Sequence, residues 1–194
     1  MAGRPRKASI ETVLDRAMEV FWRLGYAEAA MSDLTEACGV GPSSLYRTFE
    51  SKQELFRRAV ERYAARDAAG LSALLETDDP HEMLGSMLDQ AARSYVDPVL
   101  PRGCAVLSGR AADPDAARVL KDLREAFRTR VKDRIQQGVE AGQLRSDVDP
   151  EATSRVFLSL LQGLSNQAAD GADSVSLLAM AQAARPWVDS LRQP

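Results

Sequence analysis

The stretch Asp33–Phe49, DLTEACGVGPSSLYRTF, has the residue spacing of a helix-turn-helix. Its first part carries apolar residues at helical spacing, and Gly39 follows where a residue in the left-handed conformation can end a helix. Gly41 then supplies a tolerated N-cap, and Pro42 occupies the first helical position, where its missing N–H is not needed. The stretch therefore predicts two short helices joined by a tight turn.

The second of these helices has two faces of different chemistry. Leu45 and Phe49 are four residues apart, so both side chains are predicted to face inward. On the opposite side an arginine can donate two hydrogen bonds to a guanine edge, and small or hydroxyl-bearing residues can approach bases and phosphates. The candidate DNA-contacting residues are Pro42, Ser43, Ser44, Tyr46 and Arg47. The spacing alone also fits a helical hairpin inside a larger bundle.

A wider set of residues matches a known pattern: Ala17, Phe21, Gly25, Tyr26, Asp33, Leu34, Glu36, Ala37, Gly39, Val40, Leu45, Tyr46, Phe49, Ser51, Lys52 and Leu55. Through them the chain from Ile10 to Phe56 resembles the DNA-binding domain of the TetR (tetracycline-repressor-like) family of bacterial transcriptional regulators. The resemblance implies a homodimeric regulator, most often a repressor, that binds a palindromic operator and is released by a small-molecule effector.

The chain departs from the family pattern at two places. Ala29 and Ala30 stand where the family usually has threonine or serine before the first helix of the motif, so the cap is expected to shift to Ser32, a further candidate DNA contact. Gly41 replaces a usual serine, which weakens the predicted cap of the second helix and leaves the preferred operator open.

Basic residues on both sides of the motif are further candidates. The N-terminal arm carries Arg4, Arg6 and Lys7, which can enter a narrow minor groove; the alternative is a frayed terminus. After the motif, Ser51 and Glu54 have the spacing of a capping box, with Lys52 in the first turn of the helix that follows. A lysine beside the N–H groups of a helix start favours phosphate binding.

The formal net charge of −3 is unevenly divided. Residues 1–66 contain 11 basic and 9 acidic residues, a net charge of +2, whereas the remainder contains 14 basic and 19 acidic residues, a net charge of −5. This asymmetry supports DNA binding weakly, because differences of this size are common on solvated surfaces. A sequence-independent DNA-binding protein, which remains an alternative, is expected to carry far more positive charge.

The whole chain is predicted to be all-α, with about nine helices. No stretch alternates in the manner of a strand, and Asp-Pro pairs at 79–80, 113–114 and 149–150 have the pattern of helix starts. We expect a DNA-binding domain at 1–50 and a regulatory domain at 51–194, linked by a helix from 51 to about 76. A short apolar helix is expected at 100–109, and a mixed, solvated charged face on the helix after residue 114.

The last two predicted helices are apolar over more of their surface than one interior face requires. In the resembled family the two corresponding helices of each subunit form a four-helix dimer interface. The candidate interface residues are Phe157, Leu160, Leu161, Leu164, Leu177, Leu178, Ala181 and Val188.

The regulatory domain has several candidate effector-binding residues. Met83, Met87, Tyr95, Phe127 and Phe157 can line a pocket, although such side chains are more often plain core.

Cys104 is a candidate of another kind, because it follows Arg102 at the start of the helix expected at 100–109, and both features favour the thiolate. An Arg-Gly-Cys step here also resembles a subgroup of the family that responds to electrophiles or oxidants. The alternative is that Cys104 is a small buried hydrophobe.

Composition and motifs argue against several other classes of protein. Two distant cysteines and a single histidine, His81, expected in an exposed first turn, argue against a metal site or a disulfide scaffold. No nucleophile has a base nearby in sequence and no phosphate-binding glycine loop appears, so we expect no catalytic residues, no cofactor and no enzyme. No run of 18 apolar residues and no secretion signal is present, and a cytoplasmic protein is expected.

Overall fold

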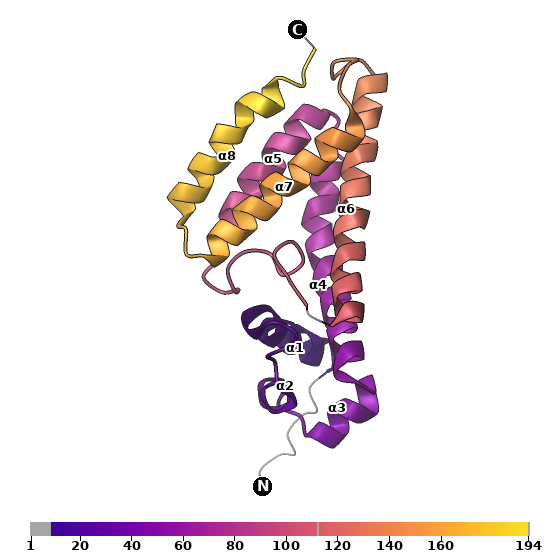
Figure 1. The fold of residues 1–194 in the computed structure, drawn as a ribbon, viewed down its shortest axis with the longest axis vertical. Helices are drawn as coiled ribbons and strands as arrows, with labels where there is room; N and C mark the ends of the chain where they lie inside the picture. The colour runs from indigo at the N-terminus through magenta and orange to yellow at the C-terminus, as the bar shows by residue number, and fades with distance from the viewer. Residues whose placement is uncertain (1–8, 112, 194) are drawn as a thin grey trace. The chain divides into compact units, whose positions relative to one another are not determined.

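In the computed structural model, residues 9–111 and 113–193 are described, and they form eight α-helices (Figure 1). The helices are α1 (Ile10–Leu24), α2 (Met31–Cys38), α3 (Pro42–Phe49), α4 (Lys52–Leu75), α5 (Pro80–Ser94), α6 (Pro114–Glu140), α7 (Pro150–Ala169) and α8 (Ser174–Asp189). Within these residues the one β-type pairing is an isolated bridge between Leu144 and Arg192. The predicted all-α fold is confirmed.

The described residues divide into two compact units. Unit 1 contains the residues up to Arg66 and those of Gly109–Leu120, and unit 2 contains Asp67–Ser108 and the residues from Lys121 onward. Both α4 and α6 contribute residues to each unit. The functional boundary at residue 50 stays a prediction.

Unit 1 is built on α1, which packs against α2, while α2 packs against α3. The Ser9 hydroxyl accepts from the Thr12 N–H at 3.1 Å and so caps α1, as its sequence predicts. The first half of α4 joins this core through the Phe56 ring, whose centroid lies 5.0 Å from that of Phe21. An ion pair of 2.8 Å between Asp15 and Arg62 adds a polar link from α1 to α4. These contacts make the start of α4 a fixed support for the helix-turn-helix.

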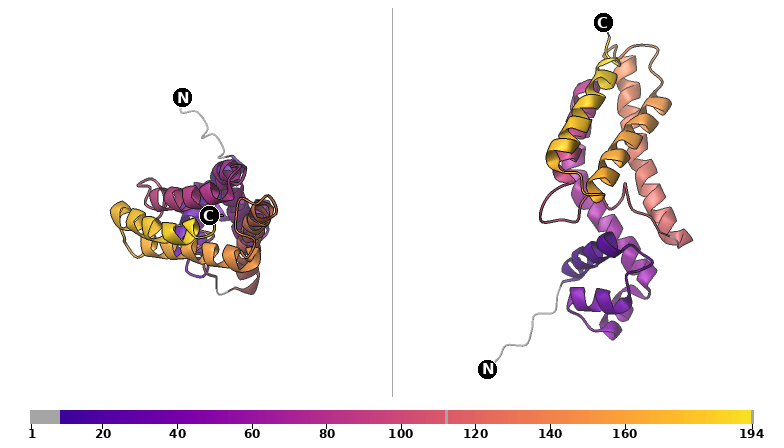
Figure 2. Two further views of the ribbon diagram at one scale, coloured as in Figure 1. Left: turned by 90° about the horizontal axis from the view of Figure 1, so that it is seen from above. Right: turned by 60° about the vertical axis from the view of Figure 1, so that its left-hand side comes forward.

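Unit 2 is a helical bundle in which α5, α7 and α8 pack against one another, as both further views in Figure 2 show. Asp79, Asp149 and Asp173 cap these three helices through side-chain hydrogen bonds to backbone N–H groups. Asp79 and Asp149 each precede a proline at the first helical position, as the sequence predicts.

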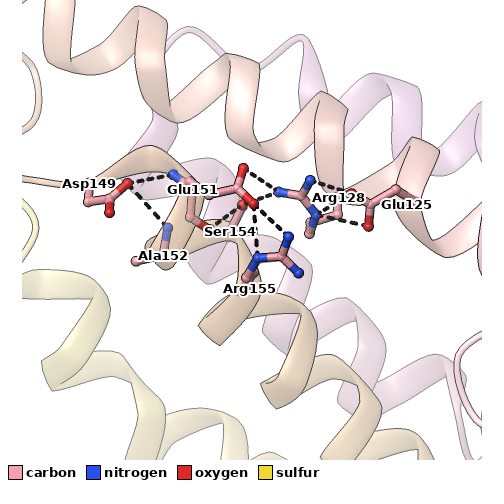
Figure 3. A network of polar contacts seen from close by, with 7 residues as sticks. All are labelled: Glu125, Arg128, Asp149, Glu151, Ala152, Ser154 and Arg155. Carbon is pink, nitrogen blue, oxygen red and sulfur yellow. Dashed lines mark hydrogen bonds and ion pairs between the residues drawn. The ribbon is translucent and has the colours of Figure 1, made fainter.

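Between α6 and α7 lies a polar network centred on Arg128, which is only 5% exposed (Figure 3). Its guanidinium donates to Glu125 on its own helix and, on α7, to Glu151 at 2.9 Å and Ser154 at 3.1 Å. Arg155 donates to the same Glu151 carboxylate. The solvated face predicted for this helix is therefore wrong at Arg128, because its charge is buried but matched by carboxylates.

Two further predictions differ from the structure. Residues 101–108 form an irregular segment with a turn instead of the expected helix, because Gly103 has a φ of +87° and its N–H donates to the Tyr95 carbonyl. His81 is 9% exposed rather than exposed, because its Nε2 lies 2.8 Å from Asp189 Oδ1 where α8 packs on α5. Among the described helices, none combines the length and apolar character that crossing a membrane requires.

Candidate nucleic-acid interface

The turn and the second helix of the helix-turn-helix have the predicted boundaries. Gly39 ends α2 in the left-handed conformation, with φ 66° and ψ 30°, and its N–H donates to the Glu36 carbonyl. The helix α3 then begins at Pro42, and Gly41 serves as an N-cap without a side-chain hydrogen bond. The turn is therefore set by backbone geometry that glycine adopts without strain.

One face of α3 is anchored and the other is open to solvent. Leu45 and Phe49 are each 2% exposed, whereas Tyr46 is 48% exposed. Exposed side chains on the outer face also include Pro42, Ser43 and Arg47. Partly buried Ser44 lies beside them, and its hydroxyl oxygen is 3.5 Å from Arg47 Nη2. The predicted contact residues of α3 thus form one continuous surface.

Ser32 is not the cap of α2. The N-cap is Ala30, and the Asp33 carboxylate accepts from the Ala30 N–H at 2.9 Å. The helix begins before Ser32 because Asp33, at the third helical position, accepts from the N–H of the N-cap residue Ala30, which is one half of a capping box. Ser32 is exposed, so its candidate contact with DNA does not depend on a capping role.

Lys52 has partners inside the protein that its sequence position did not reveal. Its Nζ donates to the Ala27 carbonyl at 3.2 Å and lies 4.7 Å from the centre of the Tyr26 ring. The Ser51 hydroxyl accepts from the Glu54 N–H at 3.0 Å, so half of the predicted capping box is present. The cation is thereby held near the start of α4.

Unit 1 has three further features: a groove, a buried cysteine and the candidate basic arm. A groove of about 610 Å³ runs beside the end of α3 and the start of α6. It is lined by Thr48, Glu50, Ser51, Gln53, Glu54, Arg57, Arg58, Asp115, Ala116, Arg118 and Val119. Cys38 lies in the core of the motif, and burial raises the pKa of its thiol to about 11. The basic-arm candidates Arg4, Arg6 and Lys7 lie outside the described residues.

In unit 2, the candidate effector residues gather around one hydrophobic core. Met83, Met87 and Phe157 are buried in it, and Tyr95 and Phe127 pack against it. The structure thus brings together five residues that lie on α5, α6, α7 and the segment after α5. Contact with a ligand stays a prediction.

The surroundings of Cys104 differ from those expected. No helix begins at residue 101, so the helix N-terminus expected beside its thiol is not formed by this segment. Arg102 donates to the Ala168 carbonyl at 2.9 Å, at the end of α7. The cation that interacts electrostatically with Cys104 is Arg124, whose pKa is lowered by burial, while the charge of Cys104 acts in the opposite direction. Cys104 itself is 5% exposed.

Most of the predicted dimer residues face the interior of their own subunit. Those buried in its core are Phe157, Leu161, Leu164, Leu177, Ala181 and Val188. Because these side chains already fill their own core, they have little surface left for a partner, and their assignment to an interface stays a prediction. Leu160 and Leu178 are only partly buried, so they keep exposed surface for a partner, and their assignment to the interface also stays a prediction.

Exposed apolar residues that the sequence analysis missed lie on the same two helices. Val156 is 45% exposed on α7, and Val175 and Met180 are 73% and 38% exposed on α8. Gly163 has no atom within 4 Å of the position a Cβ would occupy, so a neighbouring helix can approach closely there. Val156, Leu160 and Gly163 have i, i+4, i+7 spacing, and this second stripe was readable in the sequence.

Two family models match these two parts of the chain. One, described as bacterial regulatory proteins of the tetR family, matches residues 13–59, and one described as the tetracyclin repressor-like C-terminal domain matches residues 80–184. The chain belongs to the TetR family. Like other TetR-family proteins it is a DNA-binding transcription regulator and not an enzyme.

Relatives of this TetR-family protein support the same assignment over its length. The HTH-type transcriptional repressors ComR and BdcR of Escherichia coli (strain K12) are 29% and 30% identical, and each alignment covers 92% of this chain and 88% of the relative. A cysteine mutant of the TetR family regulator CifR, complexed with 26-bp double-strand operator DNA, has a TM-score of 0.87 and 32% identity. That comparison covers 94% of this chain and 98% of CifR.

Proposed function

We propose that this TetR-family protein is a homodimeric repressor, acting in the cytoplasm, that binds a palindromic operator and is released by a small-molecule effector. The observation that carries the proposal is the outer face of α3, where Tyr46 and Arg47 stand exposed above the buried anchors Leu45 and Phe49. Support comes also from the relatives described as repressors and from CifR, whose structure contains operator DNA.

The roles of the α3 residues follow from their chemistry. Arg47, with Ser43, reads base edges, because a guanidinium can donate two hydrogen bonds to guanine. Tyr46 and Lys52 bind phosphates and fix the position of α3 in the groove. The small side chain of Pro42 allows close approach to the DNA, and the hydroxyls of Ser44 and Ser32 contact it. The basic arm reaches the neighbouring minor groove.

A second copy of the chain covers the exposed apolar stripes of α7 and α8. Val156, Leu160 and Gly163 on α7 and Val175 and Met180 on α8 supply the apolar area that such an interface needs. A two-fold axis between the copies presents one α3 to each half of a palindromic site.

The effector binds among the residues of the core of unit 2, in which Met83, Met87 and Phe157 are buried and against which Tyr95 and Phe127 pack. Methionine and aromatic side chains suit an apolar molecule, because methionine adapts to ligand shape and aromatic rings provide large contact areas. Operator release by such a molecule requires that it bind the DNA-free conformation more tightly than the DNA-bound one.

The test of DNA recognition uses a duplex selected from a random-sequence pool by the protein, and a shuffled duplex of the same composition. Arg47→Ala is expected to lose about 1–3 kcal/mol on the selected duplex and to relax one operator position, whereas Lys52→Ala weakens both duplexes alike. Arg130→Ala, an exposed arginine of α6, is the matched control and should change neither affinity. Equal affinity of the unaltered protein for both duplexes would instead favour sequence-independent binding.

Removal of residues 2–7 tests the arm separately. Loss of its basic residues should lower DNA affinity and flatten the dependence of affinity on salt, since fewer counterions are released. An unchanged slope would show that the arm makes no contact.

The test of dimerisation places charges on the two sides of α7. Leu160→Asp is expected to convert the dimer to a folded monomer in sedimentation, because an unpaired charge is costly to desolvate at an apolar interface. Leu161→Asp should instead unfold the subunit, since Leu161 is 4% exposed in its own core. Gln136→Asp, on the exposed side of α6, is the control. A dimer that survives Leu160→Asp would place the interface elsewhere.

A second candidate for the regulatory input is Cys104, because the Arg124 guanidinium donates to the carbonyl of Val106, two residues after Cys104, at 2.8 Å and so lies beside this segment. Such a cation stabilises the thiolate, which adds to a quinone carbon to form a C–S bond while the quinone oxygen takes up a proton. Operator release by a quinone that is abolished in Cys104→Ser would support this input. Release that persists in Cys104→Ser would exclude it.

A further inference from the structure

The connection between α3 and α4 consists of only two residues, Glu50 and Ser51. Glu50 has φ 58° and ψ −40°, and it is the one non-glycine residue with a positive φ in the described parts of the chain. The Ser51 N–H donates to the Phe49 carbonyl two residues earlier. These features define a γ-turn with positive φ, a rare and strained turn for an L-residue.

The contacts on both sides of Glu50 keep this conformation in place. Its own N–H donates to the Tyr46 carbonyl at 2.8 Å and closes the end of α3. Phe49 is buried just before it, with the Arg58 guanidinium 5.0 Å from the ring centre. The Ser51 hydroxyl caps α4 just after it. The turn therefore has an anchored residue on each side and little room to relax.

The residue type at position 50 adds to the energetic cost of this turn. A glycine would adopt a positive φ without steric strain, and a carboxylate at the C-terminal end of a helix is unfavourable for the helix dipole. Strain of this kind persists where the surrounding structure over-determines it, and it concentrates at functional sites.

We propose that Glu50 is a positioning residue, whose strained turn fixes the angle between α3 and the first half of α4. This inference rests on the proposed operator binding. Tyr46 and Arg47 belong to α3, whereas Lys52 begins α4. The conformation of this one turn therefore determines whether Arg47 can contact a base while Lys52 contacts a phosphate. A helix of this length is about 12 Å long, and a rotation of about 20° at one end moves the other by about 4 Å, more than a hydrogen bond tolerates.

Three variants distinguish the effect of the backbone conformation at position 50 from the effect of the side-chain charge. Glu50→Gly keeps the positive φ, Glu50→Gln keeps the side-chain shape without the charge, and Glu50→Val opposes positive φ because its Cβ is branched. Affinities are measured on the duplex selected by the unaltered protein and on the shuffled duplex. We expect Glu50→Gly and Glu50→Gln to bind the selected duplex within about threefold of the unaltered protein. Glu50→Val should bind it at least about tenfold more weakly, which corresponds to about 1.4 kcal/mol.

Folding is followed by circular dichroism and by the fluorescence of the two tryptophans, Trp22 in α1 and Trp187 in α8, at the assay temperature. Should Glu50→Val unfold there, Glu50→Ala takes its place, with an expected loss of about three- to tenfold because alanine lacks the branched Cβ.

Equal affinity of the folded Val or Ala variant and Glu50→Gly would overturn the inference. A loss in Glu50→Gln as large as that in Glu50→Val would also overturn it, because the side chain and not the turn would then be responsible. Failure of the unaltered protein to prefer its selected duplex is a different result, and it would remove the proposed function together with this inference.

Discussion

Replacing Gly85 by alanine tests how α8 is held against α5. The Arg185 side chain of α8 crosses directly over this glycine, so that an added Cβ would lie 1.7 Å from its Nη1 and 2.5 Å from its Cζ. Beyond the glycine, Arg185 Nη2 pairs with Asp89 at 2.5 Å, and the two side chains are 33% and 35% exposed. An alanine at position 85 must therefore displace the guanidinium and break this pair.

The expected magnitude comes from two opposing effects. Glycine to alanine inside a helix stabilises by about 1 kcal/mol, whereas a partly exposed ion pair is worth about 0.2–1 kcal/mol, and moving the arginine adds a small strain. Gly85→Ala alone should therefore change the free energy of unfolding by less than about 0.5 kcal/mol. In an Arg185→Ala background, where nothing crosses the glycine, the same change should stabilise by about 1 kcal/mol.

Urea unfolding of the four proteins at one fixed protein concentration measures this difference, since any self-association makes stability depend on concentration. The expected coupling between the two positions is about 0.5–1 kcal/mol. Equal effects of Gly85→Ala in both backgrounds, within about 0.3 kcal/mol, would show that Arg185 does not cross Gly85 in solution.

Three further predictions concern single side chains. Hydrogen bonds from Arg62 and then Arg66 hold the pKa of Asp15 below its ordinary value despite its partial burial. The stability that this shift contributes is present above about pH 4 and is lost as the pH falls through the lowered pKa of the folded state. Acid unfolding curves of Asp15→Asn should therefore lack this loss of stability. Arg102→Ala removes two hydrogen bonds, to the carbonyls of Ala168 in α7 and Ala172 in the segment after it, and should cost about 1–2 kcal/mol in urea unfolding, with Arg102→Lys recovering only part, because lysine lacks the planar fork. Because burial raises the pKa of Cys38 to about 11, iodoacetamide at pH 8 should modify it slowly in the folded protein and rapidly in urea, as mass spectrometry would show; equal rates would contradict its burial.

The sequence by itself determined the features that depend on local hydrogen bonding. The starts of α1, α5 and α7 follow from a capping side chain and, for α5 and α7, from a proline in the first turn; these groups act on N–H groups within three residues. The helix-turn-helix follows in the same way from Gly39, Pro42 and the four-residue spacing of Leu45 and Phe49. In each of these features the interacting groups lie within one or two helical turns of each other in the sequence. They can therefore be predicted without knowing the tertiary structure.

The tertiary structure decided which face of each helix is interior and which charges are buried. Leu160 and Leu161 are neighbours of the same type, yet only Leu161 fills the core, because that depends on where α5 and α8 lie. Arg128 is buried because Glu151 and Ser154 come to it from α7, and Lys52 is occupied because Ala27 lies beside it. In each case the partner is more than twenty residues away in sequence, so the burial of the side chain is a property of the packed helices and cannot be read from the segment that carries it.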